Sequence, residues 1–172
     1  MRRILTMLLT GCSVFGLVGG TVLTQAGAEG DREALAKELR GAWLPLESGM
    51  TTSRREGTPI SAKYEIDNGT FQLSVYITRG DRLSEVIVDH NVGTIAKVDV
   101  LTDSGDLAAA RDQKEAMARA TRTLEAATAD LVRANSGYRA VSAMPRLNDG
   151  HPIVDVLLVN GTDWRVVHER LD

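Results

Sequence analysis

Residues 60–87, ISAKYEIDNGTFQLSVYITRGDRLSEVI, decide the fold because they recur, 81 positions later, as residues 141–168, VSAMPRLNDGHPIVDVLLVNGTDWRVVH. Six of the 28 ungapped pairs are identical, and the apolar positions largely match. Turn glycines are among the identities, as in the pair Gly80 and Gly161. A repeat that keeps both the turns and the apolar pattern predicts one supersecondary unit that is used twice.

Within this unit, residues 70–78 alternate apolar and polar side chains, which predicts a half-buried strand with one wet face. The wet face would carry Gln72, Ser74 and Tyr76. Before it, Asp67-Asn68-Gly69 has the residue types of a tight hairpin turn. The other predicted strands are Ile60–Ile66, Leu83–Val88, Thr94–Leu101, Tyr138–Leu147, Pro152–Val159 and Trp164–Leu171.

Three segments have helical patterns. Residues 31–44 place apolar side chains on one helical face, and Pro45 then interrupts the pattern. Residues 46–56 fit a short helix or a loop, and the repeat offset favours the helix. The alanine-rich stretch 106–134 fits either one long helix or a helical hairpin.

The order of elements is therefore helix, strands, helix, strands. Because tight turns link the strands, the strands are antiparallel, and the helices must cover the apolar face of each sheet. The predicted fold class is α+β in two similar halves, residues 29–101 and 102–172. Each half is a helix followed by an antiparallel sheet of three to four strands. Whether the halves share one sheet stays open.

Residues 1–28 read as a secretory signal peptide. A positive start at Arg2 and Arg3 precedes an apolar stretch, and Ala26-Gly27-Ala28 offers a cleavage site. Glycines that interrupt the apolar run disfavour a transmembrane helix. We therefore expect export, most simply to a bacterial periplasm.

A lipoprotein anchor is the alternative, because Leu9-Thr10-Gly11-Cys12 has the shape of a lipobox. Only a lipidated Cys12 would place the protein on a membrane. Cys12 is also the only cysteine, so a chain cleaved after Ala28 has no disulfide, thiolate metal site or cysteine nucleophile. Its net charge would be −5 rather than −3, which argues against a nucleic-acid partner.

The rest of the sequence contains no recognisable pattern of a catalytic, metal-binding or phosphate-binding site. His90, His151 and His168 lack metal-binding spacing and are expected to be ordinary surface residues. Serines lack the G-x-S-x-G setting of a hydrolase, and glycines stand singly, without a phosphate loop. We predict no catalytic, cofactor-binding or metal-binding residue, and no enzymatic activity.

Val86-Ile87-Val88-Asp89 is followed by Gly93-Thr94-Ile95, which gives the pattern V-x-V-D-x-x-x-G-x-[IV]. This pattern is the signature of PepSY domains, and residues 58–101 resemble that family. Asp89 and Gly93 are most simply turn residues. The second half resembles the same unit but ends before a D-x-x-x-G turn, so it is a truncated or diverged copy. The resemblance implies an exported or membrane-associated module that inhibits or chaperones peptidases and has no catalytic residue.

Four residues are candidates for contacting a partner: Trp43, Gln72, Tyr76 and Trp164. The tryptophans align through the repeat with leucines and could simply fill the core, but tryptophan is also common at interface anchors. A sheet edge offers a further surface for an extended peptide. The leading hypothesis is a protein-binding module of the cell envelope. The alternatives are a module that senses a small ligand or metal between the halves, and a hydrolase whose acid/base set the sequence does not display.

Overall fold

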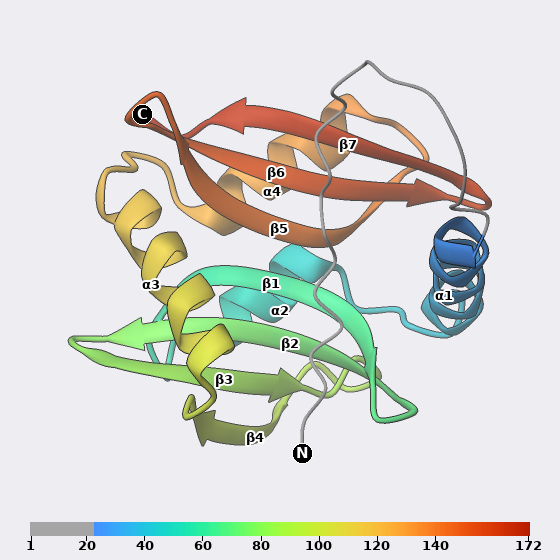
Figure 1. Cartoon of the computed structure of the whole chain (residues 1–172), viewed down its shortest axis with the longest axis horizontal. Helices are drawn as coiled ribbons and strands as arrows, with labels where there is room; N and C mark the ends of the chain where they lie inside the picture. The colour runs from blue at the N-terminus through green and yellow to red at the C-terminus, as the bar shows by residue number, and fades with distance from the viewer. Residues whose placement is uncertain (1–22) are drawn as a thin grey trace.

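The computed structural model describes residues 23–172, which form four helices and one seven-stranded antiparallel sheet (Figure 1). The sheet order is β4-β3-β2-β1-β5-β6-β7. The predicted α+β class is confirmed. The helices are α1 (Leu23–Leu39), α2 (Leu46–Ser53), α3 (Ser104–Ala118) and α4 (Leu124–Ala134). The strands are β1 (Thr58–Asp67), β2 (Thr70–Arg79), β3 (Arg82–Val88), β4 (Ile95–Val100), β5 (Arg139–Asn148), β6 (His151–Asn160) and β7 (Asp163–Arg170).

All seven strands lie within two residues of their predicted bounds. Their turns have the expected geometry: Asn68 and Asp149 adopt positive φ angles of 50° and 51°. The following Gly69 and Gly150 have φ angles of 79° and 82°. Two successive residues with positive φ make the turn that matches the twist of a hairpin. Local turn chemistry therefore sets the register of both hairpins.

The strands of residues 29–101 and those of residues 102–172 belong to one sheet. The question of whether the two predicted halves share a sheet is thereby answered. The junction is short, since β1 and β5 pair only through Ala62 with Ala143 and Lys63 with Ser142. In Figure 1 the green strands β1 to β4 and the orange to red strands β5 to β7 curve away on either side of this junction.

Two helical predictions are refined. Residues 46–56 do contain a helix, α2, while the stretch 106–134 is two helices rather than one. The break has a physical cause, because the backbone N–H groups of Thr121 and Arg122 donate to the carbonyl of Leu171, at 2.7 and 3.1 Å. The Thr123 hydroxyl then caps α4 by accepting from the N–H of Ala126.

The first helix differs more from its prediction. It ends at Leu39 rather than near residue 44, and residues 40–45 form an irregular connection to α2. At its other end it begins at Leu23, inside the predicted signal peptide. The rest of that segment, residues 1–22 with the lipobox and Cys12, lies outside the described residues. Cleavage and lipidation therefore stay predictions.

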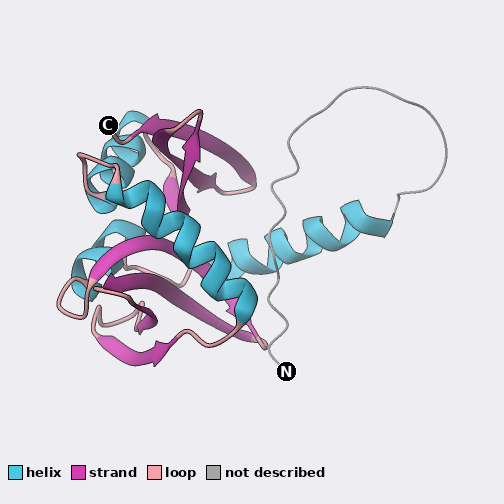
Figure 2. Cartoon of the chain, turned by 60° about the vertical axis from the view of Figure 1, so that its left-hand side comes forward, coloured by secondary structure: helices cyan, strands magenta, loops and turns pink. Residues whose placement is uncertain are grey.

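Helices cover both faces of the sheet (Figures 1 and 2). Ala62 belongs to the main core with residues of α2 and α4, whereas the hydroxyl of its neighbour Ser61 donates to Gln113 on α3, at 2.6 Å. Successive strand residues point to opposite faces, so α3 lies across the face opposite α2 and α4. Under α3 is a smaller apolar cluster of Ile60, Leu83, Leu101 and Ala110.

The expectation of one wet face on residues 70–78 is therefore wrong. Ser74 is fully buried, and Tyr76 is half-buried against the cluster under α3. The period-two pattern correctly predicts a strand. It could not show that a helix far along the chain returns to cover the polar side.

None of the three tyrosines is expected to ionise near pH 10. Burial raises the pKa of Tyr64 to about 12 and also raises that of Tyr76, while the hydrogen bond to Asp163 raises the pKa of Tyr138. We expect ultraviolet titration to show less phenolate at pH 10 in the folded protein than in the unfolded chain. Because the folded pKa of Tyr64 exceeds its unfolded value, its contribution to stability persists below pH 10 and is lost as the pH rises towards 12. Phenolate formation near pH 10 with unchanged circular dichroism would contradict this.

Candidate protein-binding surface

The connection between α1 and α2 is fastened by one side chain of β5. The guanidinium of Arg139 donates to the carbonyls of Leu39 and Ala42, both at 2.7 Å, and to that of Leu44 at 3.2 Å. It also lies over the ring of Tyr64, 5.4 Å from the centroid, and the Tyr64 hydroxyl donates to Leu44 at 2.6 Å. Hydrogen bonds from a charged donor are among the stronger ones in proteins, so this irregular connection is held firmly.

Trp43, in the same connection, points outward. Its side chain is 63% exposed, yet its indole Nε1–H donates to the carbonyl of Asn91 in the β3–β4 turn. A backbone bond from Leu44 to His90, at 3.3 Å, joins the same two segments. Val92, beside Asn91, is also 63% exposed. The indole is therefore exposed to solvent and already fixed in place.

The β3–β4 turn is itself well ordered. The Asp89 carboxylate accepts from the N–H groups of Asn91 and Val92, at 2.8 and 3.2 Å, and Gly93 has a φ of 72°. Asp89 and Gly93 act as turn residues, as predicted, because a side-chain acceptor and a positive φ are what such a turn needs. Their effect is to hold the Asn91 carbonyl where the Trp43 indole donates to it, with the exposed Val92 next along the chain.

A hollow of about 260 Å³ opens beside Trp43. Its lining is mostly apolar and comes from the α1–α2 connection, α2, α4 and β5: Trp43, Pro45, Leu46, Glu47, Val132, Arg139 and Ala140. We call this hollow, together with Val92, the Trp43 surface. Exposed apolar groups beside a concavity are typical of surfaces that bind other molecules.

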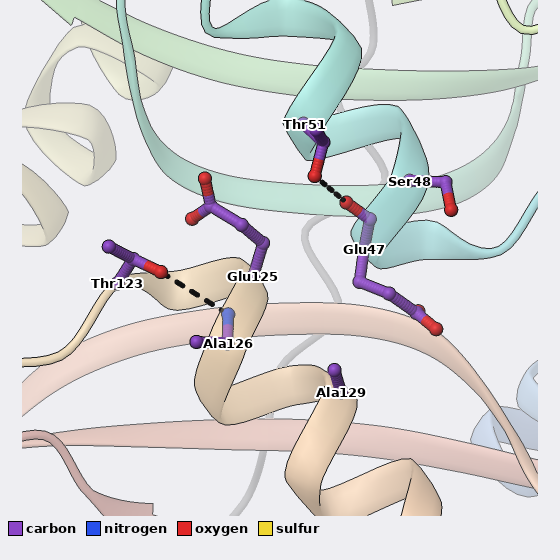
Figure 3. Close-up of a pocket in the computed structure, with 7 residues that line it drawn as sticks. All are labelled: Glu47, Ser48, Thr51, Thr123, Glu125, Ala126 and Ala129. Carbon is purple, nitrogen blue, oxygen red and sulfur yellow. Dashed lines mark hydrogen bonds between the residues drawn. The ribbon is translucent and has the colours of Figure 1, made fainter.

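A second hollow, also about 260 Å³, lies between α2 and α4 (Figure 3). Three of its polar side chains, those of Thr51, Thr123 and Glu125, have partners. The Thr51 hydroxyl donates to the Glu47 carbonyl at 3.0 Å, Thr123 caps α4, and Glu125 pairs with Arg54 at 2.8 Å. This is where a ligand between the two blocks would lie. Within residues 23–172, no three His, Cys, Asp or Glu side chains are grouped to hold a metal ion.

The four predicted partner-contacting residues do not form one surface. Trp43 is exposed, but Trp164 on β7 is half-buried against the main core. Tyr76 lies under α3, and Gln72 donates to the Ser74 hydroxyl at 2.9 Å. Sequence reasoning did not single out Val92. Its apolar side chain inside the D-x-x-x-G turn was the available signal.

His151 and His168 are exposed, as expected, whereas His90 is not a surface residue. His90 is half-buried, its ring lies 4.8 Å from that of Phe71, and its buried Nδ1 has no hydrogen-bond partner among the described residues. His168 on β7 contacts the buried carboxylate of Asp155 at 2.6 Å, and Arg146 on β5 contacts it at 2.7 Å. The carboxylate of Asp155 thereby links β5, β6 and β7. These contacts also satisfy the hydrogen-bonding capacity of a buried acid, so we assign them a structural role.

No family model, curated protein or solved structure matches this chain. In the described part of the chain, no helix combines the length and the apolar character needed to cross a bilayer.

Proposed function

We propose that this protein is a non-enzymatic protein-binding module that docks its partner on the Trp43 surface. The observation that carries the proposal is an indole that is 63% exposed and yet held by a hydrogen bond to Asn91. Tryptophan is enriched among the hot-spot residues that contribute most of the binding energy of protein interfaces. An indole that is already immobilised loses little conformational freedom on binding, so more of its contact energy becomes affinity.

The chemistry of the surface suggests what the partner presents. Pro45, Leu46, Val132 and Ala140 make the hollow beside Trp43 largely apolar. The guanidinium of Arg139 donates to three backbone carbonyls, so it stabilises one side of the hollow and is not available to pair with an acidic group of the partner. We therefore expect an apolar side chain of the partner to enter the hollow, with the indole and Val92 packing against its flank.

The PepSY resemblance supports a narrower form of this proposal. The partner would be a peptidase of the bacterial envelope that the module inhibits or chaperones, and the protein would be exported through its leader. We also propose that the chain is built from two copies of one unit. In support, β1 and β5, like β2 and β6, begin 81 residues apart, the offset of the sequence repeat. Both β1 and β5 carry a register shift at the equivalent place, around residues 60 and 141.

A small-ligand or metal-sensing module is the alternative. It would use the hollow between α2 and α4 (Figure 3), where Glu125 already pairs with Arg54. We prefer the Trp43 surface because its exposed side chains, Trp43, Pro45 and Val92, are largely apolar. A thermal-shift screen with metals and small molecules separates the two ideas, since a saturable shift that Glu125→Gln abolishes would favour the alternative.

The direct test is photo-crosslinking in the native cells. A photoreactive tryptophan analogue, which keeps the indole ring and its N–H, replaces Trp43 in one variant and Thr162, an exposed residue of the β6–β7 turn, in a matched control. We expect one recurrent envelope protein to be crosslinked from position 43 and not from position 162, with a peptidase favouring the narrower proposal. Identical products from both positions, or none from position 43, would contradict docking on the Trp43 surface.

A further inference from the structure

The strand β4 is an edge of the sheet that bears exposed apolar side chains. It pairs only with β3, so one side of its backbone is open in the described structure (Figure 1). Val98 and Val100 are 43% and 53% exposed. An open edge of this kind is a ready template for pairing with another strand.

The hydrogen-bond register identifies the groups that face the open side. The N–H of Leu101 donates to the carbonyl of Leu83 at 3.0 Å, so these two residues form a hydrogen-bonded pair. Such pairs alternate along an antiparallel ladder. Asp99 therefore directs its backbone towards Glu85 of β3, whereas Val98 and Val100 direct their N–H and C=O groups outward.

The side chains of β4 are complementary to a second copy of the same strand. Residues 96–100 read Ala-Lys-Val-Asp-Val, with opposite charges on either side of Val98. An antiparallel pair centred on Val98 places Lys97 opposite Asp99 of the second copy, twice over by symmetry. Lys97 and Asp99 already share one face of the strand, where their side chains contact at 2.6 Å. The same register places Val100 opposite Ala96.

We propose that two copies of this protein associate edge to edge through β4, about a two-fold axis at Val98, and so join their sheets into one. The axis makes the interface isologous, with the same patch used on both copies. The opposite edge of the sheet, β7, is not complementary in charge to a second copy of itself. Pairing β7 about its exposed Val166 would place Asp163 opposite Glu169, and both are acidic. Because a six-residue edge makes a small interface, we expect a dimer in the micromolar range. This inference does not depend on the Trp43 proposal.

Charge reversal tests the register. We would express the full chain, purify the folded protein and measure its dimer dissociation constant by analytical ultracentrifugation. Lys97→Asp and Asp99→Lys each place like charges opposite one another in the homodimer, and should weaken association roughly tenfold or more. Mixing the two variants opposes two acidic residues with two basic ones, so the mixture should form a heterodimer. The double variant should regain the wild-type constant.

The mixing experiment also controls for folding, because a misfolded variant would not be rescued by its counterpart. Val98→Pro is a second probe: its N–H faces outward, so proline is compatible with the monomer but removes the central hydrogen bonds of the dimer. A wild-type protein that stays monomeric at all micromolar concentrations would overturn the proposal. Single reversals that leave the constant unchanged, or a mixture that fails to associate, would also overturn it.

Discussion

Arg139→Met is expected to lower the free energy of unfolding by about 3 kcal/mol and to loosen the segment that presents Trp43. Methionine keeps most of the apolar packing but removes the donors that satisfy three carbonyls at 2.7–3.2 Å. Among the described residues, only the carbonyl of Leu44 then retains a side-chain donor, the Tyr64 hydroxyl. Urea denaturation measures the stability, and indole emission in a Trp164→Phe background reports on the environment of Trp43.

Two further variants sharpen this experiment. Arg139→Lys keeps the charge but cannot place a planar fork of donors on the same carbonyls, so we expect an intermediate loss. Arg133→Met is the matched control: Arg133 is 75% exposed and makes one ion pair, with Asp130, so its loss should change stability by less than about 0.5 kcal/mol. Equal stability of the Arg139→Met protein and the control would show that the Arg139 contacts do not hold the connection.

Gly57→Val should destabilise the fold by about 3 kcal/mol or more. Gly57 links α2 to β1, and a Cβ atom added there would lie 2.7 Å from the carbonyl oxygen of Thr78 and 3.0 Å from a methyl carbon of Ile77. The carbonyl is backbone within the sheet and cannot move aside cheaply. Glycine is therefore required because the backbone at position 57 passes close to the backbone of β2, and not because of its dihedral angles.

Gly41→Ala is the control for this prediction. A Cβ atom at Gly41 would meet only the carbonyl oxygen of Glu38, at an ordinary contact distance of 3.5 Å. We expect a change within about 1 kcal/mol for this variant in the same urea titration. If Gly57→Val were equally mild, the close approach at Thr78 would not be a determinant of the fold.

The strands and hairpins could be predicted because their signals are local. Alternation over residues 70–78 and the turn residues Asp67-Asn68-Gly69 specify a hairpin without reference to the rest of the chain. The need for glycine at position 57 could not be predicted in the same way, because its close approach to Thr78 depends on tertiary packing.

The covering of the sheet could not be predicted, because it is set by contacts between distant segments. Helix α3 is rich in alanine, and its buried residues, Ala110 and Ala116, are small. Its sequence therefore has no row of large apolar residues that would predict which side faces the sheet. The helix nevertheless covers the polar side of β2. The break between α3 and α4 likewise depends on Leu171, about fifty residues away.

The candidate site was only partly accessible from the sequence. Trp43 was identified as a candidate, but the repeat aligned it with Leu124, which is fully buried, whereas Trp43 is exposed. The two differ because α1 ends at Leu39, so Trp43 lies in an irregular connection and not on a helix. The role of Arg139 in holding that connection spans about a hundred residues, and no local pattern points to it.

The central claim, docking on the Trp43 surface, is tested most directly by measuring the affinity of the protein crosslinked from position 43 for purified wild-type and Trp43→Ala chains. Trp43 is exposed, so its loss should leave the fold intact. Removal of a tryptophan anchor typically costs 2 kcal/mol or more, so the account predicts a dissociation constant at least about thirtyfold higher. A constant equal to that of the wild type would contradict it.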